Sequence, residues 1–169
     1  MPYPSPPTDT QVHVQVQACG VNFADIYTCQ GLHRETNPPF VMGLECAGVI
    51  IHTGSQSNNL QVGDRVLVHT GCPGLHQEVV CVEALDCFVI PDKMKWEEAA
   101  ALPVNYLTAY FCLADLGNLR NGQTVLIPSA GGGVGWAATQ LARMVVLQPI
   151  FMCTLNALFS RLNRASTGF

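Results

Sequence analysis

Charged side chains are scarce in this sequence: they make up 12% of its 169 residues, against roughly 25% in an average soluble domain. So small a share indicates extensive buried surface, either inside the chain or against a further part of the fold. The formal net charge of −4 also excludes the strongly basic surface that binds phosphate backbones. We therefore expect no nucleic acid among the partners.

Zinc-binding spacing is absent as well. The chain has eight cysteines, but no two of them are separated by two residues, and its five histidines follow no ligand pattern. The sequence accordingly predicts no metal site, and each cysteine is expected to be a small buried hydrophobe. Residues 1–7 are polar and proline-rich, without the apolar core of a signal peptide. Free thiols in a reducing cytoplasm are the resulting expectation.

Long apolar runs are missing too. The apolar stretch Met144–Cys153 contains Gln148 and Pro149 and is much shorter than the roughly 20 residues that span a bilayer. The sequence therefore predicts no transmembrane segment.

What the sequence does contain begins with a strand pattern. Apolar Val12, Val14 and Val16 alternate with polar residues over Gln11–Gln17, which predicts a half-buried strand. Four shorter strands are predicted at Ala47–His52, Arg65–His69, Gln77–Val82 and Cys87–Ile90. Short strands separated by frequent turn residues are typical of a compact, mostly antiparallel β domain.

Helical patterns follow from about residue 94. Trp96–Leu102 is rich in alanine and glutamate, and Glu97 and Glu98 lie in its first turn, where the helix dipole favours negative charge. Pro103 is expected to interrupt this helix, and Val104–Leu113 to form a second one.

The most informative stretch combines a strand, a glycine loop and a helix. Thr124–Ile127 is the strand, Ser129–Gly135 the loop, and an apolar stripe at helical spacing follows. The stripe consists of Val134, Ala138, Leu141 and Val145. Glycines let the backbone approach a pyrophosphate, and the following helix directs its free N–H groups and positive dipole end toward it. Glycine clusters also occur in ordinary turns, but the flanking strand and helix favour the opening of a dinucleotide-binding fold.

Several motifs together resemble one family. The glycine loop matches the signature of quinone oxidoreductases and zeta-crystallin at Gly122, Gln123, Leu126, Ala130–Gly133, Gly135, Gln140 and Arg143. Segments similar to the same family, in the same order, are Ala18–Asp25, Gly43–Glu45, Gly63–Val66, Glu97–Leu102 and Asn105–Tyr110. Over roughly residues 11–145 the chain thus resembles the zinc-independent quinone oxidoreductases of the medium-chain dehydrogenase/reductase superfamily, in particular their branch of vesicle amine transport protein homologues.

The resemblance implies a mixed α/β fold class. Residues 1–95 would form a GroES-like, β-rich catalytic domain of the alcohol dehydrogenase type whose opening strands are missing, which leaves a sheet edge exposed. Residues 96–145 would form connecting helices and the first strand, loop and helix of a Rossmann NAD(P)-binding domain. Residues 146–169 diverge from the family, so the chain is expected to be truncated relative to it.

The resemblance also implies chemistry, namely hydride transfer from NADPH or NADH to a quinone or an enone-type activated alkene. It places Asn22 and Thr108 near the nicotinamide or its ribose and Tyr27 near the substrate cleft, and these three are the candidate catalytic residues. Asn22 and Leu44 stand where zinc-dependent relatives carry a cysteine and a histidine, so no zinc is implied. The implied cofactor contacts are Asn22, Thr108, Ala130, Gly131, Gly132, Gly133, Val134 and Gly135. Members of the family are often homo-oligomeric.

Other interpretations of these side chains stay open. The Thr108 hydroxyl would otherwise bond back to a helix carbonyl, and Asn22 would bond its own turn backbone. Four charged residues are expected to be structural: Asp25, Glu45, Asp64 and Arg65. Glu45 in particular is expected to be a buried, paired carboxylate rather than a base. Cys29 replaces an arginine that the family usually has there, so a cationic group is lost.

The tail allows two interpretations. Pro149–Thr154 imitates a second parallel strand and Leu155–Arg164 a helix, which would let Arg161 and Arg164 meet a 2′-phosphate. Alternatively the tail is unrelated to the fold, and the chain is a catalytically inactive fragment that acts as a binding module or has no independent function. A dinucleotide fold needs further parallel strands to hold its cofactor, which keeps the second possibility open.

Overall fold

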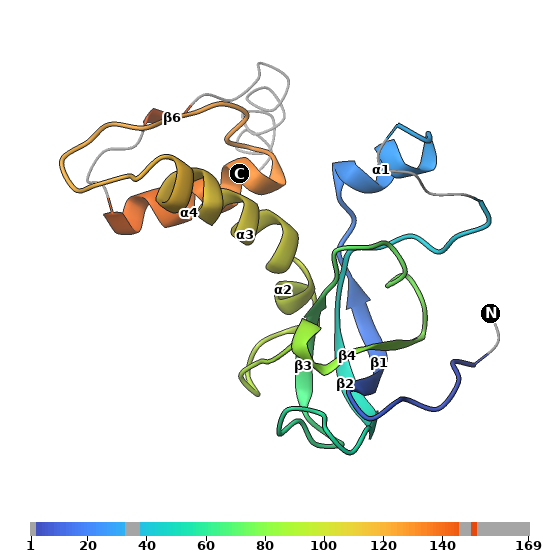
Figure 1. Cartoon of the computed structure of the whole chain (residues 1–169). Coiled ribbons are helices and arrows are strands. Elements are labelled where there is room, and N and C mark those ends of the chain that lie inside the picture. Colours follow the sequence, from blue (N-terminus) through green and yellow to red (C-terminus); the bar gives the residue numbers. More distant parts are fainter. Residues whose placement is uncertain (1–2, 33–37, 146–149, 152–169) are drawn as a thin grey trace, which may run out of the picture. The chain divides into compact units, whose positions relative to one another are not determined.

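The computed structural model describes residues 3–32, 38–145 and, for the backbone alone, 150–151. The chain separates into two compact units, residues 1–104 and residues 105–169. Each unit has its own buried apolar core, and Figure 1 shows the ribbon of both.

Unit 1 is built on a five-stranded antiparallel sheet (Figure 1). Its strands are β1 (Gln11–Cys19), β2 (Glu45–Thr53), β3 (Arg65–His69), β4 (Val79–Glu83) and β5 (Cys87–Val89), in the order β4-β1-β2-β3-β5. All five predicted strands are confirmed. The bounds differ by one or two residues except for β3: β1 runs on to Cys19, β2 is longer at both ends, β4 begins only at Val79, and β5 ends at Val89.

Strict alternation along β1 fills the main core of unit 1, as predicted. Val12 and Val14 are fully buried and pack with Ile50, Val66 and Val68 from the neighbouring strands. Burying each such side chain stabilises the fold by about 1.5–3 kcal/mol relative to leaving it in water.

A β-bulge near the end of β1 reverses which side chains face this core. Val16 pairs with Gly48 and Ala18 with Ala47, so Gln17 is an extra residue on the β1 side. Ala18 consequently packs in a second cluster with Ala47, whereas Cys19 faces the same side of the sheet as the buried core residue Cys46. The bulge therefore sets the orientation of the last residue before the turn at Gly20.

Helix α2 (Trp96–Ala100) covers the second face of the sheet. Ala99 and Ala100 are buried in the second cluster, beside Ile90. The guanidinium of Arg65 lies 4.0 Å from the centre of the Trp96 ring, a cation–π contact, and donates hydrogen bonds to backbone carbonyls of the 91–94 turn. Arg65 thus has the structural role that was predicted for it. A single turn of 3₁₀ helix, η1 (Ala84–Asp86), joins β4 to β5.

The helix predicted at Val104–Leu113 is longer and begins earlier. Helix α3 (Pro103–Tyr110) continues directly into a π-helical stretch, η2 (Phe111–Leu116). The predicted break between two helices is present, but it lies at residues 101–102: α2 ends at Ala100, and Pro103 itself opens α3. Proline fits a first helical turn because its missing N–H has no partner there in any helix.

In unit 2 the strand, loop and helix predicted around the glycine cluster are present. Strand β6 (Leu126–Ile127) is followed by the loop and by helix α4 (Gly133–Val145). Strand β7 (Ile150–Phe151) pairs with β6 in parallel, within the stretch predicted as a second strand. The predicted helix Leu155–Arg164, with Arg161 and Arg164, lies outside the described residues.

The core of unit 2 is made of small side chains. Its buried members are Ala109, Ile127, Ala130, Ala137, Ala138 and Ala142. The stripe predicted on α4 is right for Ala138 but wrong at its ends, because Val134 and Val145 are 38% and 42% exposed. Alanines bring α4 close to α3 and β6, and the larger valines lie outside that contact.

None of the helices in the described ranges is both long and apolar enough to cross a lipid bilayer.

Candidate functional site

In unit 1, Asn22 lies at the turn between β1 and helix α1 (Phe23–Cys29), where it is the N-cap residue. Its backbone N–H donates to the Asp25 carboxylate at 2.7 Å, one half of a reciprocal capping box. Its side-chain Nδ2 donates to Oε1 of Glu45, also at 2.7 Å. Asn22 is thus a turn residue, and its side-chain amide is held by a carboxylate; its place near the nicotinamide stays a prediction.

Glu45 connects this turn to the start of α3. The residue is 1% exposed, and its second carboxylate oxygen accepts a 2.7 Å hydrogen bond from the backbone N–H of Val104. A Cβ on Gly20 would collide with this carboxyl group, so the absence of a side chain there makes room for it. Buried carboxylates are costly unless hydrogen bonds replace water. Glu45 is the buried, paired carboxylate that was predicted.

An apolar, partly exposed face lies on α1 beside Asn22. Phe23 and Tyr27 stack edge to face with ring centroids 4.8 Å apart, and both rings are exposed. Cys29, which stands where the family usually has arginine, directs its thiol toward the Met42 sulfur at 3.6 Å. Two exposed aromatic rings suit an uncharged planar ring better than an anion.

Thr108 lies on an exposed position of α3 in unit 2, whereas Asn22 and Tyr27 belong to unit 1. These three residues are expected to share one cleft. Because they belong to two separate units, that expectation stays a prediction.

The glycine loop in unit 2 turns tightly into α4. Ser129 has a positive φ of 52°, and its carbonyl accepts the N–H of Gly132 at 2.8 Å. Residues 131–134 are exposed, while Ala130 is 7% exposed and belongs to the core. Of the predicted cofactor contacts in the loop, Ala130 thus packs inward, residues 131–134 face solvent at the amino end of α4, and Gly135 is partly buried.

Two glycines of the loop are needed for packing. A Cβ on Gly133 would collide with the Asn105 side chain on α3, and one on Gly135 would collide with the Ser129 carbonyl. By contrast, a Cβ on Gly132 would meet only the Ser129 carbonyl, at an ordinary 3.4 Å. The loop therefore forms a cradle with bare backbone on its outer side, and a pyrophosphate fits such a cradle.

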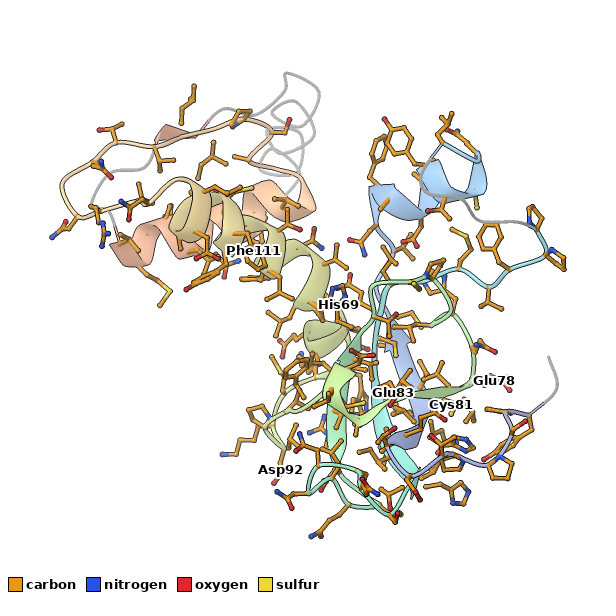
Figure 2. All side chains as sticks on the ribbon, viewed as in Figure 1. His69, Glu78, Cys81, Glu83, Asp92 and Phe111 are labelled. Carbon is orange, nitrogen blue, oxygen red and sulfur yellow. The ribbon has the colours of Figure 1, made fainter. Side chains whose placement is uncertain are left out.

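Three histidines contact backbone carbonyls. Nε2 of His13 contacts the Ser5 carbonyl at 2.8 Å, Nδ1 of His69 that of Leu44 at 3.0 Å, and Nε2 of His76 that of Gly20 at 3.0 Å. His69 is the last residue of β3 (Figure 2). Within the described ranges no three His, Cys, Asp or Glu side chains are grouped closely enough to hold a metal ion.

The cysteines differ from the prediction that each is buried. Cys46 and Cys87 are buried, and burial raises the pKa of both thiols, that of Cys87 to about 12. The exposed cysteines are Cys19, Cys29, Cys72 and Cys112, and for these the prediction is wrong. Strand alternation identifies the buried pair, whereas the exposed ones lie at strand ends, in loops and on helix surfaces, where cysteine carries no burial signal.

The model of the alcohol dehydrogenase GroES-like domain matches residues 8–92, half of the chain. This chain belongs to that family. With it, the chain belongs to the medium-chain dehydrogenase/reductase superfamily, as its motifs predicted.

Individual relatives agree. "Synaptic vesicle membrane protein VAT-1 homolog" of Danio rerio is 51% identical over 136 residues, which cover 80% of this chain and 28% of the relative. "Quinone oxidoreductase-like protein 2" of Bos taurus is 38% identical over 144 residues, 85% of this chain and 41% of the relative. The structure of Escherichia coli quinone oxidoreductase complexed with NADPH superposes with a TM-score of 0.86 at 28% identity, covering 96% of this chain and 50% of that one.

The chain therefore spans less than half the length of these curated relatives and half of the solved one. It corresponds to the GroES-like sheet with the helices that follow, and the predicted mixed α/β fold class is confirmed.

Sequence patterns missed two contacts. One is the hydrogen bond from Val104 to Glu45, for which no signal exists because a backbone N–H is common to nearly every residue. The other is the contact of Asn105 with Gly133, which only the folding of α3 against α4 creates.

Proposed function

We propose that this chain carries the substrate-side domain and the phosphate-binding loop of a zinc-independent NAD(P)H:quinone oxidoreductase. The reaction would be hydride transfer to a quinone or an activated alkene. The observation that carries the proposal is the cradle of bare glycine backbone at the amino end of α4, directly after β6. The relatives named as quinone oxidoreductases, one of them complexed with NADPH, support it.

The role of the loop follows from its geometry. Gly132 presents backbone without a side chain, and α4 is 13 residues long, so its first N–H groups and its dipole favour a negative charge at that end. Gly133 and Gly135 hold the loop against Asn105 and Ser129. The residues present thus fit a pyrophosphate, and bound NADPH or NADH would supply the hydride.

Unit 1 would supply the surface for the hydride acceptor. Glu45 fixes the side-chain amide of Asn22, and α1 presents the exposed rings of Phe23 and Tyr27. Aromatic faces bind flat uncharged rings through offset or edge contacts, which suits a quinone. We propose that Asn22, Tyr27 and Thr108 position the acceptor and the nicotinamide, in a protein that works in the reducing cytoplasm and assembles with copies of itself.

A second candidate function is a binding module without catalysis. It is favoured by the described part of unit 2, whose parallel sheet consists of β6 and β7. A nucleotide bound to so small a sheet would be held at its phosphates but not along its whole length.

A fluorescence titration of the purified chain with NADPH and, separately, NADH tests the proposal. Trp136 lies one residue beyond Gly135 and is 48% exposed, so bound nicotinamide nucleotide should quench its emission. Saturable quenching that is lost on substitution Gly132→Ala supports the nucleotide site. Identical titrations of the variant and the wild type, or no saturation with either nucleotide, would contradict it. Binding without turnover of an ortho-quinone would favour the binding module.

A further inference from the structure

Two cysteines face each other where β1 and β2 separate. Cys19 and Cys46 are partners in the strand register. The Gly20 N–H donates to the Glu45 carbonyl at 3.2 Å, which makes Gly20 and Glu45 a hydrogen-bonded pair. Hydrogen-bonded and non-hydrogen-bonded pairs alternate along an antiparallel ladder. The neighbouring pair, Cys19 and Cys46, is therefore a non-hydrogen-bonded pair, in which the two side chains approach most closely.

This position suits a disulfide. Directly opposed residues of a non-hydrogen-bonded pair have Cα atoms about 4.5 Å apart, within the roughly 4.4–6.8 Å that disulfides span. Neither cysteine is in a disulfide in the structure, and the Cys19 thiol donates to the Leu75 carbonyl at 3.5 Å. The bulge at Gln17 is what brings the Cys19 side chain to the face of the sheet that holds Cys46.

No other cysteine of the described residues competes for Cys46 from within the sheet. Cys87 also faces this core, but Val68 on β3 lies between Cys46 and Cys87. The register pairs Cys46 with Val68 and Val68 with Cys87. Two strand spacings amount to about 9–10 Å, beyond the roughly 7 Å limit for a bond without backbone movement.

We propose that Cys19 and Cys46 are a modification site, a reversible disulfide that closes the base of the segment 20–45. This segment leaves the β1–β2 ladder at Cys19 and rejoins it at Cys46, and it carries α1 with Asn22 and Tyr27. The bond would tie both ends of the segment covalently, where the Gly20–Glu45 and His76–Gly20 hydrogen bonds now hold them. The inference does not depend on the proposed function, because the bond forms without cofactor or substrate.

The oxidant is a small disulfide such as glutathione disulfide. Cys19 is exposed, loses its proton to solvent and attacks one sulfur of that disulfide, which expels one glutathione thiolate and leaves a mixed disulfide on Cys19. Buried Cys46 then loses its proton and attacks the Cys19 sulfur, which expels the second glutathione. Two protein thiols are oxidised, and one glutathione disulfide is reduced to two thiols. Burial raises the pKa of both cysteines, so exchange should speed up as the pH rises from 7 to 9.

The test uses the whole reduced chain in glutathione buffers of rising oxidised fraction, followed by alkylation and peptide mapping by mass spectrometry. The expected result is a peptide pair joined through Cys19 and Cys46, formed faster at higher pH and released by dithiothreitol. Exposed Cys29, Cys72 and Cys112 should acquire glutathione alone, which makes them internal references.

Two variants sharpen the test. Cys19→Ser changes an exposed residue, so the chain should fold, and its Cys46 should stay reduced because glutathione disulfide does not reach it. Cys72→Ser is the matched control, and the bond should form in it as in the wild type. Stable glutathione on Cys19 beside a reduced Cys46 would overturn the proposal. So would a Cys46 that is oxidised equally in Cys19→Ser.

Discussion

Nδ2 of Asn22 donates to Oε1 of Glu45 at 2.7 Å, so a buried carboxylate fixes the side chain that is predicted to lie near the nicotinamide. Substitution Glu45→Gln keeps the side-chain volume but replaces one of the two carboxylate oxygens, which accept from Asn22 and Val104, with an NH₂ group that cannot accept. One N–H of Asn22 or Val104 would then lack its acceptor, and the free energy of unfolding should fall by about 1–3 kcal/mol. Urea unfolding measures the change.

The matched control is Glu78→Gln, at an exposed residue of the same charge (Figure 2). It should lower the free energy of unfolding by less than about 0.5 kcal/mol. Equal midpoints for both variants would show that the Glu45 contacts contribute nothing.

Substitution Gly133→Val should remove most of the NADPH affinity. A branched side chain there would push Asn105 aside and displace the first turn of α4, so the loop loses its geometry as well as its bare surface. Gly132→Ala separates the two effects, because its Cβ fits the free protein and would obstruct only a phosphate. Gly71→Ala, also in open space, is the control. Calorimetric titration with NADPH, supported by circular dichroism, should rank affinity as control above Gly132→Ala above Gly133→Val. Wild-type affinity in Gly133→Val would place the nucleotide elsewhere.

Purified without chelators, the chain should contain far less than one zinc per molecule. The resemblance predicts Asn22 and Leu44 at the positions of zinc ligands, and neither an amide held by Glu45 nor an apolar side chain binds zinc well. Atomic absorption on the dialysed protein measures the content. A stoichiometric zinc that resists dialysis would contradict this expectation.

Stability should fall above pH 9 in reducing buffer. Unfolded thiols titrate near 9.0, whereas the pKa of Cys87 is raised to about 12 and that of Cys46 is raised further. Between these values the unfolded chain has lost protons that the folded chain keeps, so each thiol lowers the unfolding free energy by about 1.4 kcal/mol per pH unit. The effect is absent below pH 9. Urea midpoints at pH 7, 9, 10 and 11 measure the slope, which Cys87→Ala should reduce and Cys72→Ala, at an exposed thiol, should leave unchanged.

Turnover of an ortho-quinone with NADPH should be at least about 100-fold slower for the 169-residue chain than for a version extended by a relative's remaining sequence. Hydride transfer is sensitive to displacements of about 1 Å, and the two described parallel strands support the loop from one side. Steady-state kinetics on both proteins decides the matter. Comparable rates would mean that the short parallel sheet already completes a working site.

The sequence by itself determined the elements that depend on local patterns. Alternating valines specify β1 because successive strand residues face opposite sides, and the order of strand, glycine loop and helix identifies the start of a nucleotide-binding unit. Glu45 could be recognised as structural because a lone carboxylate at the start of an apolar strand needs partners to be buried. The family resemblance extended this to the fold class, since its motifs recur in a fixed order.

Only the tertiary structure decided which groups meet. One partner of Glu45 is a backbone N–H 59 positions away, and Gly133 is required because α3 brings Asn105 against it. The bulge at Gln17 turns Cys19 toward Cys46, although the sequence around it shows a regular strand. Such contacts join residues that are distant in the chain, and their register follows from the packing of the whole sheet and not from any local preference.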